Sequence, residues 1–221
     1  MEEKNSINWY PGHMKKTKDE IMKNIKLVNL VVEIVDSRAP ISTKNPDIDN
    51  MINNKPKVIV LTKKDLAKED SIGTFISYYN QKNINAVAID ATKKTGISPL
   101  LKLLDTIKEE NYQKNKEKGM IKKPLRIMIV GIPNVGKSTL INQIIGKKSA
   151  KTGNTPGITK SQQWIKIKGD IELLDTPGIL WPQIENKEVA EKLSFLGSIR
   201  DKVVEIEDIY YEFIQYLIRN N

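Results

Sequence analysis

The sequence contains no cysteine, so disulfides, thiolate chemistry and cysteine-based zinc sites are excluded. It also lacks any apolar run near the ~20 residues that a membrane-spanning helix needs. The first thirteen residues, MEEKNSINWYPGH, have no apolar segment of the signal-peptide kind. We therefore expect a cytoplasmic protein with no membrane partner.

Charge is present in quantity but unevenly spread. The 221 residues are 39% hydrophobic and 29% charged, which is typical of a soluble globular protein with a sizeable core. Residues 1–168 carry 31 Lys/Arg and 16 Asp/Glu, whereas residues 169–221 carry 5 and 11. Residues 147–168 hold six lysines and no acidic residue. These lysines fit either a solvated surface or a nucleic-acid interface, and composition does not choose between them.

Alternating strand and helix patterns predict an α/β fold. Short β-branched runs predict strands at 27–36, 57–62, 85–90, 125–131, 163–168 and 171–175. Helical spacing predicts helices at about 68–82, 98–117 and 137–147, and at 184–200 and 206–219 near the C-terminus. We expect a three-layer fold, with helices on both faces of a mostly parallel sheet. Ligands of such sheets bind at the carboxyl ends of the strands.

A phosphate-binding loop lies between a predicted strand and a predicted helix. Residues 131–138, GIPNVGKS, fit the pattern G-x-x-x-x-G-K-[ST] at every fixed position. Backbone N–H groups of such a loop surround phosphate oxygens, and the helix N-terminus adds partial positive charge. Lys137 is expected to reach the β- and γ-phosphates, and Ser138 to bind Mg²⁺. The predicted phosphate-binding residues are Asn134, Val135, Gly136, Lys137, Ser138 and Thr139.

The sequence DTPG at 175–178 closes the next strand and predicts the γ-phosphate side of the site. Asp175 can hold the Mg²⁺ shell, and the backbone N–H of Gly178 can approach the γ-phosphate. The intervening loop, AKTGNTPGITKSQQW, offers Thr155 and Thr159 as candidates for a second hydroxyl on Mg²⁺. Although D-x-x-G alone is a weak motif, its place after the phosphate loop makes it specific.

A guanine-selecting turn is predicted where the strand 57–62 ends, in VIVLTKKDL. The Asp65 carboxylate can accept hydrogen bonds from N1–H and the exocyclic amine of guanine, whereas adenine presents a lone pair there. Such pairing rejects the wrong base by ~10⁴-fold or more. Lys63 can lay its alkyl stem over the base. Thr62 stands where asparagine is usual, so we expect weaker tethering of the base, with selectivity retained through Asp65.

A second turn, AIDATKKTG at 88–96, resembles the loop whose backbone N–H contacts the guanine oxygen. Ala91 and Thr92 are the predicted contacts, and Asp90 replaces the usual serine. Either turn alone is a poor motif. Two such turns, each closing a strand, favour guanine over adenine.

The base motifs precede the phosphate motifs, which is the order of a circularly permuted GTPase. Within that group the chain resembles the ribosome biogenesis GTPase A family. The resemblance covers about residues 7–205 and rests on NWYPGHMKK, VDSRAPIST with Asn45-Pro46, TKKD, GIPNVGKST, TPGITK and DTPGIL. It favours Thr159 over Thr155 on Mg²⁺, because the family pattern places its threonine after Pro-Gly-x.

This resemblance implies a GTPase that acts in assembly of the large (50S) ribosomal subunit. Such a factor docks on ribosomal RNA with GTP bound and is released after hydrolysis. The implied partners are GTP, GDP and the ribosomal RNA and proteins of the subunit, with Mg²⁺ as cofactor and a monomeric protein. The alternative is a GTP-dependent RNA-binding scaffold with negligible hydrolysis. An ATPase would conflict with Asp65.

Three parts of the chain are expected. Residues 1–26 would form an N-terminal arm and helix, residues 27–180 the permuted GTPase domain, and residues 181–221 a C-terminal helical segment. The family has a longer C-terminal helical domain, and we expect this chain to stop inside it. The permuted order joins the loop 175–178 directly to the C-terminal helices, so these helices are predicted to report the nucleotide state.

The residue that activates water is not the usual one. Ile179 stands where many GTPases place a glutamine, and an isoleucine cannot orient water. His13 is the only histidine, its ordinary pKa of ~6.5 suits proton transfer, and the resemblance implies a catalytic role. The alternative is a helix-start residue that packs or binds RNA. Related GTPases with asparagine at the position of Asn134 bind K⁺, so K⁺ is a second candidate cofactor. The alternative is that Asn134 only caps the loop.

Overall fold

A six-stranded sheet forms the centre of the computed structural model, which describes residues 7–8, 12–52, 54–146, 163–167, 170–199 and 206–220. The strands, in spatial order, are β4 (Asn85–Ala88), β3 (Lys57–Thr62), β2 (Leu30–Asp36), β5 (Leu125–Val130), β7 (Ile171–Asp175) and β6 (Gln163–Ile167). Neighbouring strands are parallel except β6, which runs antiparallel to β7. The predicted mostly parallel sheet is confirmed.

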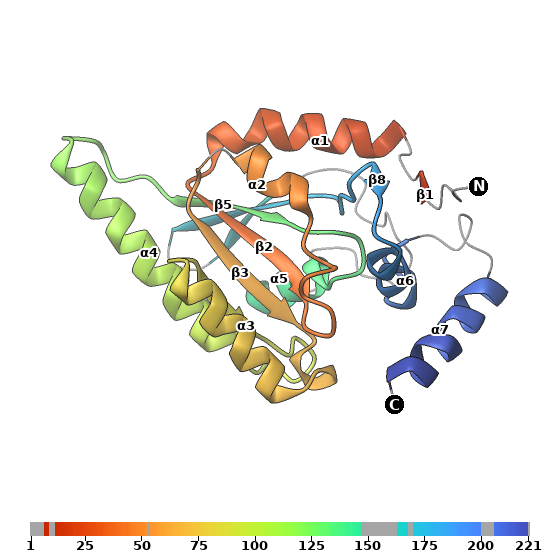
Figure 1. Ribbon diagram of the computed structural model, residues 1–221. Helices are drawn as coiled ribbons and strands as arrows, with labels where there is room; N and C mark the ends of the chain where they lie inside the picture. The colour runs from red at the N-terminus through yellow and green to blue at the C-terminus, as the bar shows by residue number, and fades with distance from the viewer. Residues whose placement is uncertain are drawn as a thin grey trace.

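Helices cover both faces, because successive residues of each central strand point to opposite sides. On one face lie α1 (Gly12–Asn24), α2 (Pro46–Ile52) and α3 (Glu69–Gln81), which pack on buried residues such as Val31, Val35 and Met128. On the other lie α4 (Ile97–Glu117) and α5 (Lys137–Ile145), which pack on Val32, Val60 and Ile127. Figure 1 shows α1 and α2 lying together along one side of the sheet.

The helix α2 was not predicted, although its start carries recognisable signals. The side chain of Asn45 accepts a hydrogen bond from the backbone N–H of Asp47 at 2.9 Å, as a helix cap does. Pro46 occupies the first helical position, and Asp47 and Asp49 lie in the first turn, where negative charge is favourable. The sequence analysis used this stretch only as a family motif.

The observed elements are somewhat shorter than several predicted ones. The strand predicted at 27–36 begins at Leu30, because Ile25–Leu27 forms a 3-10 turn. The helix predicted at 184–200 is α6 (Lys187–Phe195), which starts where the Asn186 side chain accepts from the N–H of Val189. It ends before Gly197, whose φ of 66° lies in the left-handed region that terminates helices.

Both terminal segments pack against the sheet domain. A short antiparallel pair joins β1 (Ile7–Asn8) to β8 (Gln183–Ile184), as Figure 1 shows. Met14 of α1 and Leu193 of α6 are buried in the main core. The last helix, α7 (Ile206–Asn220), lies against α6, with the Phe195 ring 5.1 Å from that of Phe213. In the described ranges, no helix is both long and apolar enough to span a bilayer.

Candidate nucleotide-binding site

The phosphate loop lies between β5 and α5, as the motif requires. A Cβ added to Gly131 would lie 2.6 Å from the carbonyl oxygen of Ile34, so only glycine permits this approach to β2. Gly136 caps α5 with a φ of 94°, and Asn134 also has a left-handed backbone at 62°. Val135 is buried, while Ser138 and Thr139 are half-buried in the first turn of α5. The predicted phosphate-binding residues therefore form one continuous loop and helix start.

Lys137 is fully enclosed behind this loop. Its Nζ donates to the carbonyl oxygens of Ile132 at 2.7 Å and Gly131 at 3.1 Å. Burial lowers the pKa of Lys137 to about 8, against the opposing charge of Asp175. A bound phosphate group would raise the pKa of Lys137 again, because a nearby anion favours the charged form of a lysine.

Asp175 ends β7 in a position that suits a cation. Burial raises the pKa of its carboxyl to about 6, although Lys137 and the backbone N–H of Thr176 act in the opposite direction. Both carboxylate oxygens are buried, and neither has a hydrogen-bond partner of ordinary geometry among the described residues. An ionised carboxylate so placed needs a positive partner, so the site fits Mg²⁺ and its water shell.

Mg²⁺ at this site could take its other ligands from nucleotide phosphates, hydroxyl groups and water. Among the described residues, no group of three or more His, Cys, Asp or Glu side chains could hold a metal ion. Mg²⁺ commonly binds one carboxylate together with substrate phosphates and waters. Ser138 stands at the start of α5, as predicted, whereas Thr159 lies outside the described residues.

The loop that follows Asp175 packs directly on the phosphate loop. A Cβ on Gly178 would lie 2.7 Å from the backbone nitrogen of Pro133, so this contact also requires glycine. The backbone N–H of Ile179 donates to Gly131 at 3.1 Å, and the Ile179 side chain is buried in the core. That side chain does not orient water. The side chain of Asn45 donates to the Ile179 carbonyl oxygen at 2.9 Å, a contact that the sequence analysis did not anticipate.

The base turn contacts the phosphate loop through two side chains. The buried hydroxyl of Thr62 lies 2.6 Å from the carbonyl oxygen of Val135 and 3.0 Å from that of Val35. The Nζ of Lys63 donates to the carbonyl oxygen of Asn134 at 2.8 Å. The tertiary structure thus joins motifs that lie 71 and 73 residues apart. Asp65 follows in a short 3-10 turn with its side chain exposed.

The second predicted base turn lies against the first. The backbone N–H of Lys64 donates to the carbonyl oxygen of Ile89 at 3.1 Å. Asp90 accepts hydrogen bonds from the hydroxyl and N–H of Thr92, which lower the pKa of its carboxyl. Ala91 and Thr92 therefore occupy a tight turn beside Lys63–Asp65, and their guanine contacts stay predictions.

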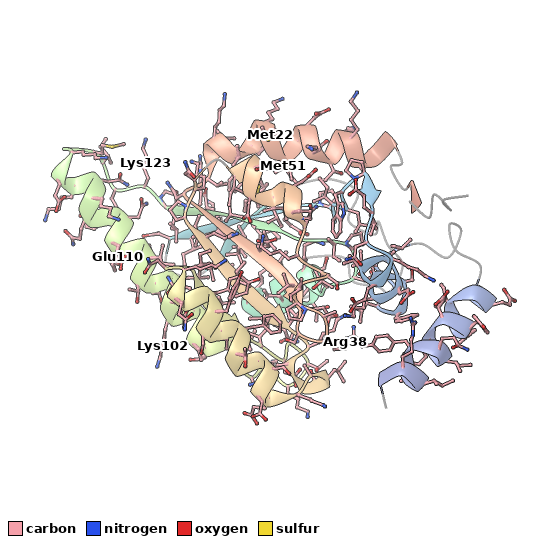
Figure 2. The ribbon with its side chains drawn as sticks, viewed as in Figure 1. Met22, Arg38, Met51, Lys102, Glu110 and Lys123 are labelled. Carbon is pink, nitrogen blue, oxygen red and sulfur yellow. The ribbon has the colours of Figure 1, made fainter. Side chains whose placement is uncertain are left out.

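His13 is the second residue of α1, and its side chain is outside the part that the structure describes. No role was predicted for Asp36 or Arg38 in VDSRAPIST, yet the Asp36 carboxylate lies 2.9 Å from Lys63 Nζ. Figure 2 shows Arg38 at the end of the sheet where β2 and β3 finish. The sequence did contain a signal for Asp36 and Arg38, because an acidic residue at a strand end is followed two positions later by arginine.

Comparisons with known proteins show what this chain is similar to. A family model described as "50S ribosome-binding GTPase" matches residues 126–218. Ribosome biogenesis GTPase A of Priestia megaterium is 44% identical over 214 residues, covering 96% of this chain and 74% of that protein. Ribosome biogenesis GTPase A of Thermotoga maritima is 34% identical, over 97% of this chain and 74% of that protein.

Solved structures show the same architecture. GNP-bound YlqF from T. maritima superposes with a TM-score of 0.68 and 29% identity, covering 92% of this chain and 75% of that chain. A GDP-bound structure of the same protein gives a TM-score of 0.63, covering 86% and 71%. The fold, with base and phosphate motifs joined at one sheet edge, defines a circularly permuted P-loop GTPase. The chain belongs to the ribosome biogenesis GTPase A family.

Proposed function

We propose that this GTPase acts in assembly of the large ribosomal subunit, where it docks on ribosomal RNA with GTP bound and leaves after hydrolysis. The observation that carries the GTPase function is the direct contact of the guanine turn with the phosphate loop, through Thr62 and Lys63. The ribosomal role is supported by the names and matched lengths of the relatives. The six lysines of 147–168 are proposed as RNA contacts on the basis of the sequence.

The phosphate chemistry follows from two buried charges. Lys137 would exchange the carbonyl oxygens of Gly131 and Ile132 for β- and γ-phosphate oxygens. Ser138, Asp175 and Thr159 are the proposed protein ligands of Mg²⁺, which neutralises phosphate charge when bound. The close approach of Gly178 to Pro133 supports the proposal that the Gly178 N–H senses the γ-phosphate.

His13 is the proposed group that positions or deprotonates the attacking water. The pairing of Ile7 with Ile184 and of Asn8 with Gln183 supports this role. This pairing joins the N-terminal segment to β8, which begins eight residues after Asp175. The helix α1, which carries His13, starts at Gly12, shortly after β1. This pairing supports the proposal that His13 can reach the loop that senses the γ-phosphate. Asn134 remains the proposed K⁺ residue.

The C-terminal segment contacts the phosphate loop itself. The Asn134 side-chain amide donates to the Gly197 carbonyl oxygen at 2.5 Å, and the Ser198 hydroxyl donates to Pro133 at 3.0 Å. Gly197 and Ser198 directly follow α6, and α6 packs against α7. These contacts support the proposal that the C-terminal helices report the nucleotide state to the ribosomal partner.

Steady-state GTP hydrolysis with and without large ribosomal subunits tests this function, in KCl and in NaCl, for wild type and His13→Ala. We expect turnover that subunits stimulate, and that collapses in the variant while GTP-dependent binding to subunits persists. Equal turnover of the two proteins would remove His13 from the mechanism. Equal rates in the two salts would remove K⁺.

The second candidate, a GTP-dependent RNA-binding scaffold, is favoured by the buried Ile179 side chain in place of a water-orienting residue. It predicts GTP-dependent subunit binding with no stimulated turnover. The same experiment therefore separates the two functions.

A further inference from the structure

The carboxylate of Asp36 lies at the end of β2, next to the base turn rather than the phosphates. Its side chain is only 1% exposed. The Arg38 guanidinium donates two hydrogen bonds to the carboxylate, from Nε to Oδ1 at 2.9 Å and from Nη2 to Oδ2 at 2.7 Å. The backbone N–H of Arg38 adds a third bond at 3.0 Å. This bidentate geometry fixes the orientation of the carboxylate.

The same carboxylate holds Lys63, the central residue of the guanine turn. Lys63 Nζ lies 2.9 Å from Asp36 Oδ2 and 2.8 Å from the carbonyl oxygen of Asn134. Its backbone has a φ of 55°, a left-handed conformation that is uncommon for a residue other than glycine. Such a conformation persists where surrounding contacts hold it. Two contacts of its Nζ therefore hold the Lys63 side chain in place, and the contact with Asp36 is the one between charged groups.

The Asp36 carboxylate stays ionised at neutral pH. Burial alone would raise the pKa of Asp36, but the hydrogen bonds from Arg38 and Lys63 outweigh it and the pKa is lowered. The backbone of the next residue continues the link, because the N–H of Ser37 donates to the Thr62 carbonyl oxygen at 2.9 Å. The end of β2 is thus joined to the guanine turn by both backbone and side chain.

We propose that Asp36 is a positioning residue for guanine recognition, which fixes the turn 62–65 through Lys63 so that the Asp65 carboxylate meets the base. This inference rests on the proposed guanine-binding role of that turn. Arg38 is assigned the supporting role of orienting Asp36. Neither side chain needs to touch the nucleotide.

Nucleotide selectivity tests the inference better than stability does. Inosine diphosphate lacks the exocyclic amine that Asp65 is expected to accept from, so the ratio of GDP to IDP affinity measures that contact. In Asp36→Asn we expect GDP affinity to fall on the order of 10- to 100-fold, as for loss of a hydrogen bond between charged groups. IDP affinity should fall less, so the ratio should shrink. A merely structural role would lower both affinities equally.

Two further variants sharpen the experiment. Asp47→Asn is a matched control, because Asp47 also forms an ion pair, with Lys18 at 2.8 Å, but lies on α2. It should keep the wild-type ratio. In a Lys63→Met background the Asp36→Asn change should have little additional effect, because both substitutions break the same link.

The outcomes also separate this inference from the proposed function. A wild-type protein with no preference for GDP over IDP would overturn the guanine-binding role of the turn. A wild-type preference that Asp36→Asn leaves intact, or fully additive effects of the two substitutions, would overturn only the role of Asp36.

Discussion

The hydroxyl of Thr62 lies 2.6 Å from the carbonyl oxygen of Val135, so the end of the guanine strand bonds directly to the phosphate loop. The two residues are 73 positions apart in the chain. Their contact explains how a permuted order of motifs can still form one site. The sheet order places β2 between β3 and β5, and parallel strands present their carboxyl ends at one edge.

Replacement of Thr62 by valine tests this contact, because valine keeps the shape and removes the hydroxyl. The buried carbonyl oxygens of Val135 and Val35 would lose their shared donor. We expect the free energy of unfolding to fall by about 1–3 kcal/mol and GDP to bind more weakly. Urea unfolding and fluorescent-GDP titration measure the two effects. Thr62→Ser keeps the hydroxyl and should resemble wild type, and a Thr62→Val protein with unchanged GDP affinity would contradict the link.

Asp65→Asn should change which base the site prefers. An amide in place of the carboxylate can no longer accept both guanine hydrogens, but it can donate to the extra oxygen of xanthine. We expect GDP affinity to fall at least ~10²-fold and xanthosine diphosphate to bind more tightly than in wild type. Competition against fluorescent GDP measures both affinities.

The matched control for that change is Asp70→Asn, an exposed acidic residue in the first turn of α3. It should leave the base preference unaltered. If Asp65→Asn also retained the wild-type preference for GDP, Asp65 would not be the group that recognises guanine.

Stability between pH 4 and 6 should depend on Asp175 when nucleotide and Mg²⁺ are absent. Burial raises the pKa of Asp175 from 3.8 to about 6, so the folded protein binds this proton more tightly than the unfolded chain. The resulting stabilisation is full below the unfolded pKa and is lost as pH rises through 6. The ionised carboxylate then costs about 2–3 kcal/mol relative to its protonated form.

Urea unfolding in EDTA at several pH values measures this term. The stability of wild type relative to Asp175→Asn should fall as pH rises from 4 to 6, and Mg²⁺ with GDP should restore it. Asp170→Asn, at an exposed position, should keep the wild-type pH dependence. A wild-type curve parallel to that of Asp175→Asn would rule out a raised pKa at Asp175.

Ser198→Ala should loosen the C-terminal segment from the phosphate loop. The buried Ser198 hydroxyl donates to Pro133, and its loss leaves that carbonyl oxygen without this donor. We expect the difference in amide hydrogen exchange of α6 between GDP-bound and nucleotide-free protein to shrink, because fewer contacts transmit the change. Ser194→Ala is the control, since the Ser194 hydroxyl donates within α6, to the carbonyl oxygen of Ala190. Identical GDP-dependent exchange in Ser198→Ala and wild type would exclude this route.

Local pattern predicted most of the elements. The strands at 57–62 and 171–175 have the predicted bounds. The helix α3 is one residue shorter than predicted at each end, and α4 begins one residue earlier than predicted. These segments were predicted from short β-branched runs or from helical spacing, which neighbouring residues set by themselves. The missed helix α2 is only seven residues long, and its apolar residues are too few to show a period.

The sequence by itself determined the chemistry of the protein. Its phosphate loop, its Asp-x-x-Gly turn and its base turn each need particular residue types at fixed short spacing, and short spacing can be read along the chain. These motifs were sufficient to identify a permuted GTPase and its family.

Only the tertiary structure decided how these pieces support one another. Three contacts each join residues from separate elements: the hydrogen bond of Thr62 to Val135, the ion pair of Asp36 with Lys63 and the hydrogen bond of Ser198 to Pro133. Such contacts depend on strand order and on burial, which the sheet fixes once it has formed. The same burial shifts the pKa values of Lys137 and Asp175, because desolvation is a property of the packed fold and of no local pattern.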